Sequence, residues 1–334
     1  MSFRIMPVTL DKSAKPFRRA LQYAFYDWTR DMPLGRRIVA TVGLLIQAAV
    51  LSGLLIAIRH PAIAVPLAVL FLIGLILLNG ALTSEFVRKM QLESDQIAAQ
   101  QIQQTLQVQN PESPLGYDLQ TFYKPFRDVG GDYFDVIALP HNRTLFAVAD
   151  VSGKGVPAAL LAANIQALVR SIASIDADPL TMARRINSHL SRYTPADRFA
   201  TAVFMVLSQD SGELLYVNAG HNAPVISCLG TTTFLESTGP PLGIFAEAKY
   251  ESRTAVIQPA GALLLFTDGL TDSIAAKNPE ECLRDVLADS SNSKMTRLKS
   301  LIDPELNLDD VTILLLGRPV FSNPEAGDDA SPLQ

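Results

Sequence analysis

Residues 129–158 read VGGDYFDVIALPHNRTLFAVADVSGKGVPA and contain two short apolar segments separated by a turn signal. Tyr133–Ala138 and Thr144–Ala149 are rich in apolar, β-branched and aromatic residues, and the Pro-His-Asn-Arg segment between them predicts a turn. The two segments therefore form an antiparallel hairpin. Such pairing brings Asp132, which precedes the first strand, to the same open end as Asp150, which closes the second.

The rest of the C-terminal region continues with short strands and few helices. Proline suits the first turn of a helix, which predicts helices at Pro157–Ile172 and Pro179–Leu190. Two more helices are expected at Glu280–Ala288 and Lys294–Ile302. The other expected strands are Leu119–Tyr123, Thr201–Leu207, Glu213–Asn218, Pro224–Leu229, Thr232–Leu235, Thr254–Gln258, Ala262–Phe266 and Val311–Leu316. Many strands without βαβ alternation predict an α+β sheet sandwich, and not a doubly wound sheet.

Aspartates gather at the ends of these strands. Besides Asp132 and Asp150, Asp268 follows one apolar strand, and Asp309 and Asp310 precede the last. Most lie beside glycines, which let a ligand approach the backbone. Oxygen ligands without His or Cys select Mg²⁺ or Mn²⁺ over zinc. A single aspartate at such a place more often only caps a turn, but the whole set favours a metal site.

Two uncharged apolar runs near the N-terminus, Ile38–Ile58 and Pro61–Ser84, are each long enough to span a bilayer as a helix. Only Arg59 and His60 separate them, so they predict a two-helix transmembrane hairpin over residues 38–84. A buried helical hairpin of a soluble protein is the alternative. Neither run contains a carboxylate, which argues against proton relay or transport.

Basic residues flank the hairpin on one side of the membrane. Arg36 and Arg37 precede the first run, and Arg88 and Lys89 follow the second. The positive-inside rule therefore places both termini and the C-terminal domain in the cytoplasm.

Residues 84–109 lack Gly and Pro and are rich in good helix formers, which predicts a helical connector. Its apolar heptad is imperfect. Two interpretations of the 85–109 helix therefore stay open. It either pairs with a second copy in a parallel coiled coil, which would make a homodimer, or is a solvated helix that packs on its own domain. Two prolines and a glycine in 110–116 predict a domain boundary.

Charge and cysteine usage exclude other classes of protein. Residues 1–37 hold eight basic and three acidic residues, whereas the remaining residues carry a net charge of −10. An acidic main domain argues against nucleic-acid binding. Cys228 and Cys282 lie far apart, which argues against a disulfide scaffold or a structural zinc site.

Five motifs then occur in order, at 129–135, 150–158, 218–222, 266–271 and 309–312, reading VGGDYFD, DVSGKGVPA, NAGHN, FTDGLT and DDVT. Together they resemble the metal-dependent PPM (phosphatase 2C-like) serine/threonine phosphatases, and within them the bacterial branch of stage-II sporulation protein E and the sigma-regulating phosphatases. The resemblance covers about 118–317. It implies two antiparallel sheets between helical layers, with a two-metal site at one end that holds Mn²⁺ or Mg²⁺.

The resemblance also implies roles for single residues. Asp132 and Asp150 would bind the metal pair, with Asp150 bridging and the carbonyl of Val151 completing one coordination shell. Asp268 and Asp309 would hold the other side. Asp310 stands where the wider family often has Asn, so which of the two neighbouring aspartates is the ligand stays open.

Four further residues concern the substrate and the motifs. Arg127 lies five residues before Asp132, as does the phosphate-binding Arg of the wider family, and a guanidinium binds phosphate through two hydrogen bonds. Ser152 stands where many relatives carry His, which leaves the leaving-group acid unassigned. Lys154 does not have the spacing of a P-loop, and its glycine-flanked segment predicts a turn into the next helix. His221 is expected to be structural.

The chain is thus expected to contain a basic segment (1–37), a membrane hairpin (38–84), a helical connector (85–116), a phosphatase domain (117–318) and a disordered tail (319–334). The expected function is a phosphatase anchored in the bacterial inner membrane that hydrolyses phosphoserine or phosphothreonine. By resemblance, its substrate is an anti-sigma-factor antagonist or a related partner-switching protein. The alternative is a catalytically inactive pseudophosphatase that docks a signalling partner; a hairpin that itself senses or transports is a third, weaker hypothesis.

Overall fold

A computed structural model of the chain describes residues 41–50, 61–106, 111–126, 129–195, 197–289, 293–306 and 308–320. The basic segment 1–37, the expected phosphate ligand Arg127 and residues 321–334 of the tail lie outside the described residues. The chain divides into two compact units, Met1–Asp95 and Gln96–Gln334.

The first unit contains the apolar helix Thr41–Val50 and most of α3, which runs from Pro61 to Leu106. Residues 51–60 lie outside the described residues. The two helices approach each other at Gly43 and Gly74, since a Cβ on Gly74 would lie 3.1 Å from Ile46 Cγ2 and 3.3 Å from the Gly43 carbonyl. Small residues allow this close packing of apolar helices.

Two described helices are long and apolar enough to cross a membrane. One is Ala68–Gln91 within α3, of which 17% is buried, and the other is Val156–Ala173, of which 39% is buried. The second is α4, an amphipathic helix that covers a sheet of the second unit. Of these two helices, only the segment in α3 bears on the predicted hairpin, and the shorter apolar helix Thr41–Val50 lies within its first predicted span.

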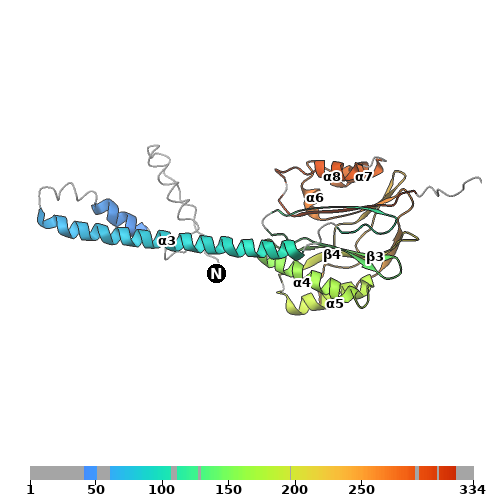
Figure 1. Ribbon diagram of the computed structural model, residues 1–334, viewed down its shortest axis with the longest axis horizontal. Coiled ribbons are helices and arrows are strands. Elements are labelled where there is room, and N and C mark those ends of the chain that lie inside the picture. Colours follow the sequence, from blue (N-terminus) through green and yellow to red (C-terminus); the bar gives the residue numbers. More distant parts are fainter. Residues whose placement is uncertain are drawn as a thin grey trace, which may run out of the picture. The chain divides into compact units, whose positions relative to one another are not determined.

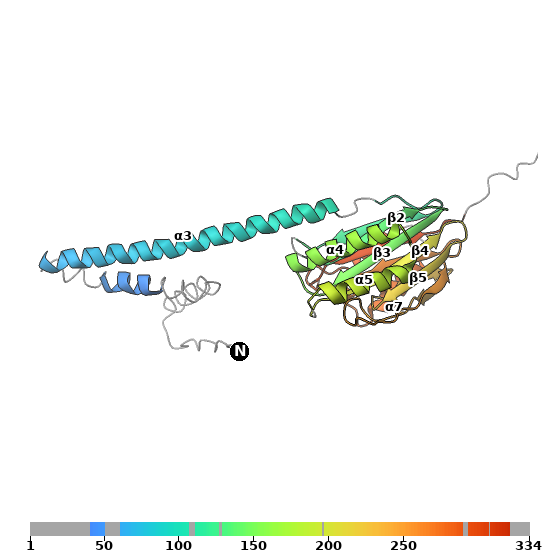
Figure 2. The ribbon, with the colours of Figure 1, turned by 90° about the horizontal axis from the view of Figure 1, so that it is seen from below.

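The second unit is a sandwich of two antiparallel five-stranded sheets. Sheet A has the strand order β1-β10-β9-β6-β7, and sheet B has the order β2-β3-β4-β5-β8. Helices α6, α7 and α8 cover sheet A, and α4 and α5 cover sheet B (Figure 1). Figure 2 shows α4 and α5 lying across the strands of sheet B. The predicted α+β sandwich with flanking helices is confirmed.

The elements of this unit, after the end of α3, are β1 (Asp118–Lys124), β2 (Tyr133–Leu139), β3 (Arg143–Val151), α4 (Val156–Ala173), α5 (Pro179–Tyr193), β4 (Ala200–Ser208), β5 (Glu213–Ala219), β6 (Val225–Cys228), β7 (Thr231–Phe234), β8 (Arg253–Val256), β9 (Ala262–Phe266), α6 (Asp268–Asp272), α7 (Pro279–Ala288), α8 (Lys294–Ser300) and β10 (Val311–Gly317).

Three apolar layers hold the sandwich together, because the central strands are buried on both faces. In β3, Phe146 and Val148 face sheet A, whereas Leu145 and Ala147 face α4 and α5. A third layer lies between sheet A and helices α6–α8 and includes Ile313 of β10. Strands buried on both faces read as continuous apolar runs, as these do in the sequence.

Local sequence signals set the ends of several elements. The Asp178 carboxylate accepts a hydrogen bond of 2.8 Å from the Thr181 amide, and Pro179 occupies the first turn of α5. Such a cap satisfies an amide that has no partner within the helix. His141 and Asn142 adopt positive φ in the turn between β2 and β3. These signals explain why the expected element ends agree with the structure within a few residues.

Two features differ from the sequence-based expectation. The expected membrane span and the connector are one continuous helix, α3, because helix-forming residues continue where the charge begins at Glu85. The short helix α6 was not predicted, since five residues are too few to show a helical period.

Candidate active site

The five predicted aspartates lie at one end of the sandwich. Asp132 immediately precedes β2, and Asp150 lies next to the end of β3, where Tyr133 pairs with Ala149. Asp268 begins α6 directly after β9, and Asp309 and Asp310 directly precede β10, which pairs with β9. The hairpin of sheet B and the two central strands of sheet A thus present their carboxylates at the same end.

Asp132 joins the two sheets. Its Oδ2 accepts hydrogen bonds from the hydroxyls of Thr267, at 2.7 Å, and Thr312, at 2.5 Å. Burial, and then the negative charge of Asp150, raise the pKa of Asp132 well above its ordinary value, although the two hydroxyls lower it. The carboxylate is therefore fixed in position in surroundings that favour a nearby cation.

Asp150 and Asp268 show the same electrostatic crowding. Burial, followed by the charges of Asp268, Asp309 and Asp310, raises the pKa of Asp150 to about 7. Burial and then the charge of Asp309 raise the pKa of Asp268. Carboxylates that raise one another's pKa in this way are a sign of a functional site.

The neighbouring aspartates Asp309 and Asp310, either of which could be the metal ligand, make different contacts. Both oxygens of Asp310 bind backbone amides: Oδ1 accepts from Phe126 at 2.7 Å, and Oδ2 accepts from Gly131 at 2.6 Å. Asp309 instead pairs with the Lys154 ammonium at 2.7 Å, and its side chain is 37% exposed. Asp310 therefore organises the loop before β2, whereas the Asp309 carboxylate pairs with the Lys154 ammonium.

Glycines allow this loop to lie against the carboxylates. A Cβ on Gly130 would collide with the Tyr123 hydroxyl and lie 2.7 Å from Asp310 Oδ2. A Cβ on Gly131 would lie 3.1 Å from the carbonyl of Val151, the predicted backbone ligand. The pair Gly130-Gly131 is therefore a packing requirement of the site.

The donor set is chemically suited to Mg²⁺ or Mn²⁺, because it consists of carboxylate oxygens whose charges are largely uncompensated. Among the residues that the structure describes, no three His, Cys, Asp or Glu side chains converge into a metal-binding group. The residues thus fit the expected ions in chemistry and location, and the structure does not bring them into a closed ligand set.

Two motif residues have structural contacts. Buried His221 Nε2 lies 3.1 Å from the Phe266 carbonyl and Nδ1 lies 2.8 Å from Thr201 Oγ1, so the ring links β4 to the end of β9. Burial lowers the pKa of His221 to about 4. The Ser152 hydroxyl accepts from the Phe199 amide at 2.9 Å. Ser152 therefore ties its loop to the segment before β4.

The prediction did not assign Thr267, Thr312, Lys154 or Gln103 to the site. Both threonines lie inside quoted motifs, next to Asp268 and two residues after Asp310, so their proximity to aspartates was the available signal. Gln103 lies near the end of α3, in the second unit. Its side-chain Nε2 donates to the Gly130 carbonyl at 2.6 Å, and its Oε1 accepts from the Gly130 backbone amide at 3.0 Å. No sequence pattern indicates that contact.

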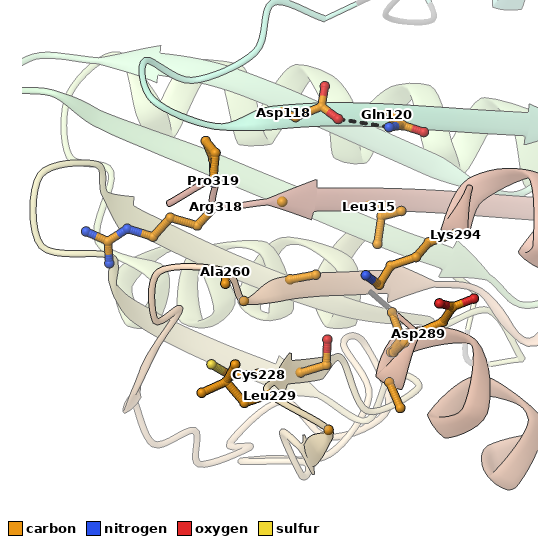
Figure 3. A pocket seen from close by; sticks show the side chains of 17 residues that line it. Asp118, Gln120, Cys228, Leu229, Ala260, Asp289, Lys294, Leu315, Arg318 and Pro319 are labelled. Carbon is orange, nitrogen blue, oxygen red and sulfur yellow. Dashed lines mark hydrogen bonds between the residues drawn. The ribbon is translucent and has the colours of Figure 1, made fainter. Parts of the chain in front are cut away.

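A cavity of about 360 Å³ lies at the other end of sheet A, beside Asp118 and Gly317. Seven residues of β10, about 20 Å, separate it from the aspartates. Figure 3 shows Asp289 and Lys294 on one side of this cavity and the Arg318 guanidinium extending away from it. Arg318 donates to the carbonyls of Asp210, Ser211 and Ile257. The cavity therefore lacks the crowded carboxylates that distinguish the first site.

Comparison with known proteins decides the family. Residues 140–319 match the family model of stage II sporulation protein E (SpoIIE). The chain belongs to this family. Two curated relatives from Bacillus subtilis strain 168 are the phosphoserine phosphatases RsbP and RsbU. RsbP is 27% identical over 55% of this chain and 46% of RsbP, and RsbU is 24% identical over 69% of this chain and 72% of RsbU. The chain thus spans about half the length of RsbP.

Solved structures confirm the fold. The RsbU and RsbW domains of Rv1364c from Mycobacterium tuberculosis match with 28% identity over 63% of this chain and 62% of that chain, with a TM-score of 0.54. The PP2C phosphatase domain of SpoIIE from Bacillus subtilis matches with 16% identity over 62% of this chain and 63% of that chain, with a TM-score of 0.55. The second unit therefore has the PP2C fold.

A further structure of the same fold was solved with a metal ion. RsbX in complex with magnesium matches with 22% identity over 63% of this chain and 98% of that chain, with a TM-score of 0.50.

Proposed function

We propose that this protein is a metal-dependent phosphoprotein phosphatase that hydrolyses phosphoserine and phosphothreonine. The observation that carries the proposal is the group of Asp132, Asp150, Asp268 and Asp309 at one end of a PP2C fold. Three of these aspartates have a raised pKa, because each is buried beside other carboxylates. Such a group favours divalent cations. The names of the relatives RsbP and RsbU, both phosphoserine phosphatases, support the same activity.

Each residue of the site would have a separate role in binding metal or substrate. Asp132, Asp150, Asp268, Asp309 and the Val151 carbonyl would hold two Mn²⁺ or Mg²⁺ ions, and Asp310 would keep the loop before β2 in place. Bound ions of this kind lower the pKa of a coordinated water and neutralise phosphoryl charge. Arg127 would bind the substrate phosphate through its guanidinium. In the reaction, a water oxygen bonds to phosphorus, and the serine or threonine oxygen leaves and takes up a proton.

The proposed substrate is a phosphorylated anti-sigma-factor antagonist or a related partner-switching protein. Support comes from the relative RsbU and from the solved structure of the RsbU and RsbW domains of Rv1364c. The acidic charge of the chain outside its N-terminal segment makes nucleic acid an unsuitable partner.

We further propose that residues 38–84 anchor the protein in the bacterial inner membrane, with both termini cytoplasmic. Exposed apolar side chains along α3, such as Leu72 and Ile76, support a lipid-facing surface. Exposed apolar side chains continue in the connector at Met90, Ile97 and Ile102. They support a homodimer through the 85–109 helix, because unpaired apolar faces favour association.

A second candidate function is a catalytically inactive docking module. The observation in its favour is that the described acidic side chains do not converge into a closed metal-binding group. The two candidates differ in one measurable property, since a docking module needs no divalent cation.

The test uses the full chain in detergent micelles, a phosphoserine peptide and Mn²⁺. We expect Mn²⁺-dependent release of phosphate, and a loss of about 10²- to 10³-fold in rate for Asp150→Asn and Asp268→Asn, in line with removal of a key electrostatic group. Asp118→Asn is the matched control, because Asp118 is an exposed strand-end aspartate at the other end of sheet A. Metal-independent activity, or full activity in the first two variants, would contradict the phosphatase mechanism.

A further inference from the structure

Lys154 occupies a fixed place beside the aspartates. It lies in the loop between β3 and α4, between Gly153 and Gly155, which have φ values of +95° and +76°. Residues with side chains rarely adopt such angles, so the two glycines define the path of this loop. Substituting either glycine would strain the backbone that presents the lysine.

The Lys154 ammonium is held by three groups. Its Nζ lies 2.7 Å from Asp309 Oδ2 and donates to the Leu308 carbonyl at 2.5 Å. It also lies 5.1 Å from the centre of the Phe126 ring, within the range of a cation–π contact. These contacts place the positive charge at the Asp309 side of the aspartate group and leave the lysine side chain 45% exposed.

Lys154 is also the cation that partly neutralises this group. Its Nζ forms an ion pair of 2.7 Å with Asp309, whose carboxylate lies at the same end of the sandwich as those of Asp150 and Asp268. The ammonium therefore supplies, in part, the positive charge that divalent ions would bring to the same carboxylates. A metal ion that takes Asp309 as a ligand meets an oxygen that is already paired.

We propose that Lys154 is a built-in counter-cation of the site, which competes with the metal ion for Asp309 and sets the affinity of that metal position. This inference rests on the proposed function. In the metal-free protein, the lysine reduces repulsion among the carboxylates. When a divalent ion binds at Asp309, the ammonium–carboxylate contact must break, so this position is the weaker of the two and fills last.

The proposal predicts two effects of opposite sign for Lys154→Met, which keeps most of the length of the side chain and removes its charge. Without metal, the variant unfolds more easily, because the carboxylates lose their cation. With metal, it binds more tightly, because no contact has to break. A lysine with a merely structural role would lower stability and would not tighten metal binding.

The experiment titrates the full chain in detergent micelles with Mn²⁺ alone, by calorimetry. We expect Lys154→Met to bind the weaker Mn²⁺ about fivefold more tightly than wild type, about 1 kcal/mol, and Lys154→Arg to remain close to wild type. The difference should shrink when ionic strength rises from about 0.05 M to about 0.5 M, because the competing pair is half exposed. Lys154→Gln serves as a second neutral variant.

The Asp309→Asn variant tests whether Lys154 acts through Asp309, because it removes the carboxylate with which the lysine pairs. If Lys154 acts through Asp309, adding Lys154→Met to Asp309→Asn should leave Mn²⁺ affinity unchanged. Unchanged or weaker binding by both neutral variants overturns the inference, as does tighter binding that persists in the Asp309→Asn background. If wild type binds no Mn²⁺, the proposed function fails as well. If wild type binds Mn²⁺, Asp150→Asn does not, and the neutral variants bind no tighter, only the role of Lys154 is overturned.

Discussion

Asp132 immediately precedes β2 and Asp135 lies three residues later within it; both are buried, but their surroundings differ. Asp135 receives the Arg170 guanidinium of α4, with Nε at 2.7 Å from Oδ2 and Nη2 at 3.2 Å from Oδ1. Asp132 receives two threonine hydroxyls, and the charges that act on it come from Asp150 and Asp310. The first carboxylate is part of a complete ion pair, and the second lies in a group that still favours a cation.

Two nearby aspartates thus have different roles: Asp135 stabilises the fold, whereas Asp132 belongs to the candidate site. The Asp135–Arg170 pair joins β2 to α4 and also accepts the Tyr133 hydroxyl at 3.2 Å. Its role is explained by the fold alone. Asp132 is held just as firmly, but burial and neighbouring charge make its ionised form costly. The fold therefore maintains a cost for the ionised form of Asp132 that a bound cation or a proton relieves.

The largest effect is expected from breaking the complete pair. Arg170→Met leaves Asp135 fully buried without its cation, which should lower the free energy of unfolding by about 3 kcal/mol. The measurement is denaturant unfolding of the full chain in detergent, followed by circular dichroism. Arg192→Met is the matched control, because Arg192 is an exposed arginine on α5 and should change stability little. Equal stability of both variants would show that the pair contributes nothing.

The second prediction concerns how the stability of the metal-free protein depends on pH, which should reflect the aspartate group and not the Asp135–Arg170 pair. The pKa of Asp150 is raised from 3.8 to about 7, so the folded state binds more protons than the unfolded state between these values. Stability in EDTA should therefore fall as pH rises toward 7 and level off above it, with Asp150 contributing at most about 1.4 kcal/mol per pH unit. Asp150→Asn should flatten the slope between about pH 5 and pH 7. Parallel curves for the two proteins would contradict the shift.

Much of this comparison could be predicted from sequence, because it depends on local pairing. The turn at 140–143 fixes the hairpin register, and that register alone places Asp132 opposite Asp150. The Asp135–Arg170 pair could not be predicted, since it depends on which face of α4 packs on β2. The continuity of α3 was also missed, because a change from apolar to charged residues at Glu85 marks a change of solvent and not the end of a helix.

Neutralising Asp132 and Asp135 one at a time should change stability by smaller amounts and in opposite directions. Asp132→Asn removes a buried charge that is repelled by Asp150, and its amide oxygen can still accept the hydroxyls of Thr267 and Thr312. Without metal, the variant should be more stable by about 1 kcal/mol. Asp135→Asn should be less stable, because Arg170 loses its charged partner. Thermal unfolding in EDTA tests this, and destabilisation by both substitutions would remove the distinction between the two sites.

The smallest effect concerns the contact of α3 with the loop that carries Asp132. The Gln103 side chain binds both the amide and the carbonyl of Gly130, and Gly131 in turn donates to Asp310. Asp135 has no such contact with α3 among the described hydrogen bonds. Gln103→Leu should therefore loosen the Asp132 end of β2 and leave the Asp135 segment unchanged.

Hydrogen exchange measures this difference directly. The loss of two partly exposed hydrogen bonds should speed exchange at Gly130 and Gly131 by about fivefold, or about 1 kcal/mol of local opening. The Val136 amide, which donates to Asp135 Oδ1 at 3.0 Å, provides the internal reference. Gln101→Leu is the matched control, because Gln101 is an exposed glutamine two residues earlier in the same helix. If exchange rises equally at Gly130 and Val136, the end of α3 stabilises the whole strand, and its contact is not specific to the aspartate group.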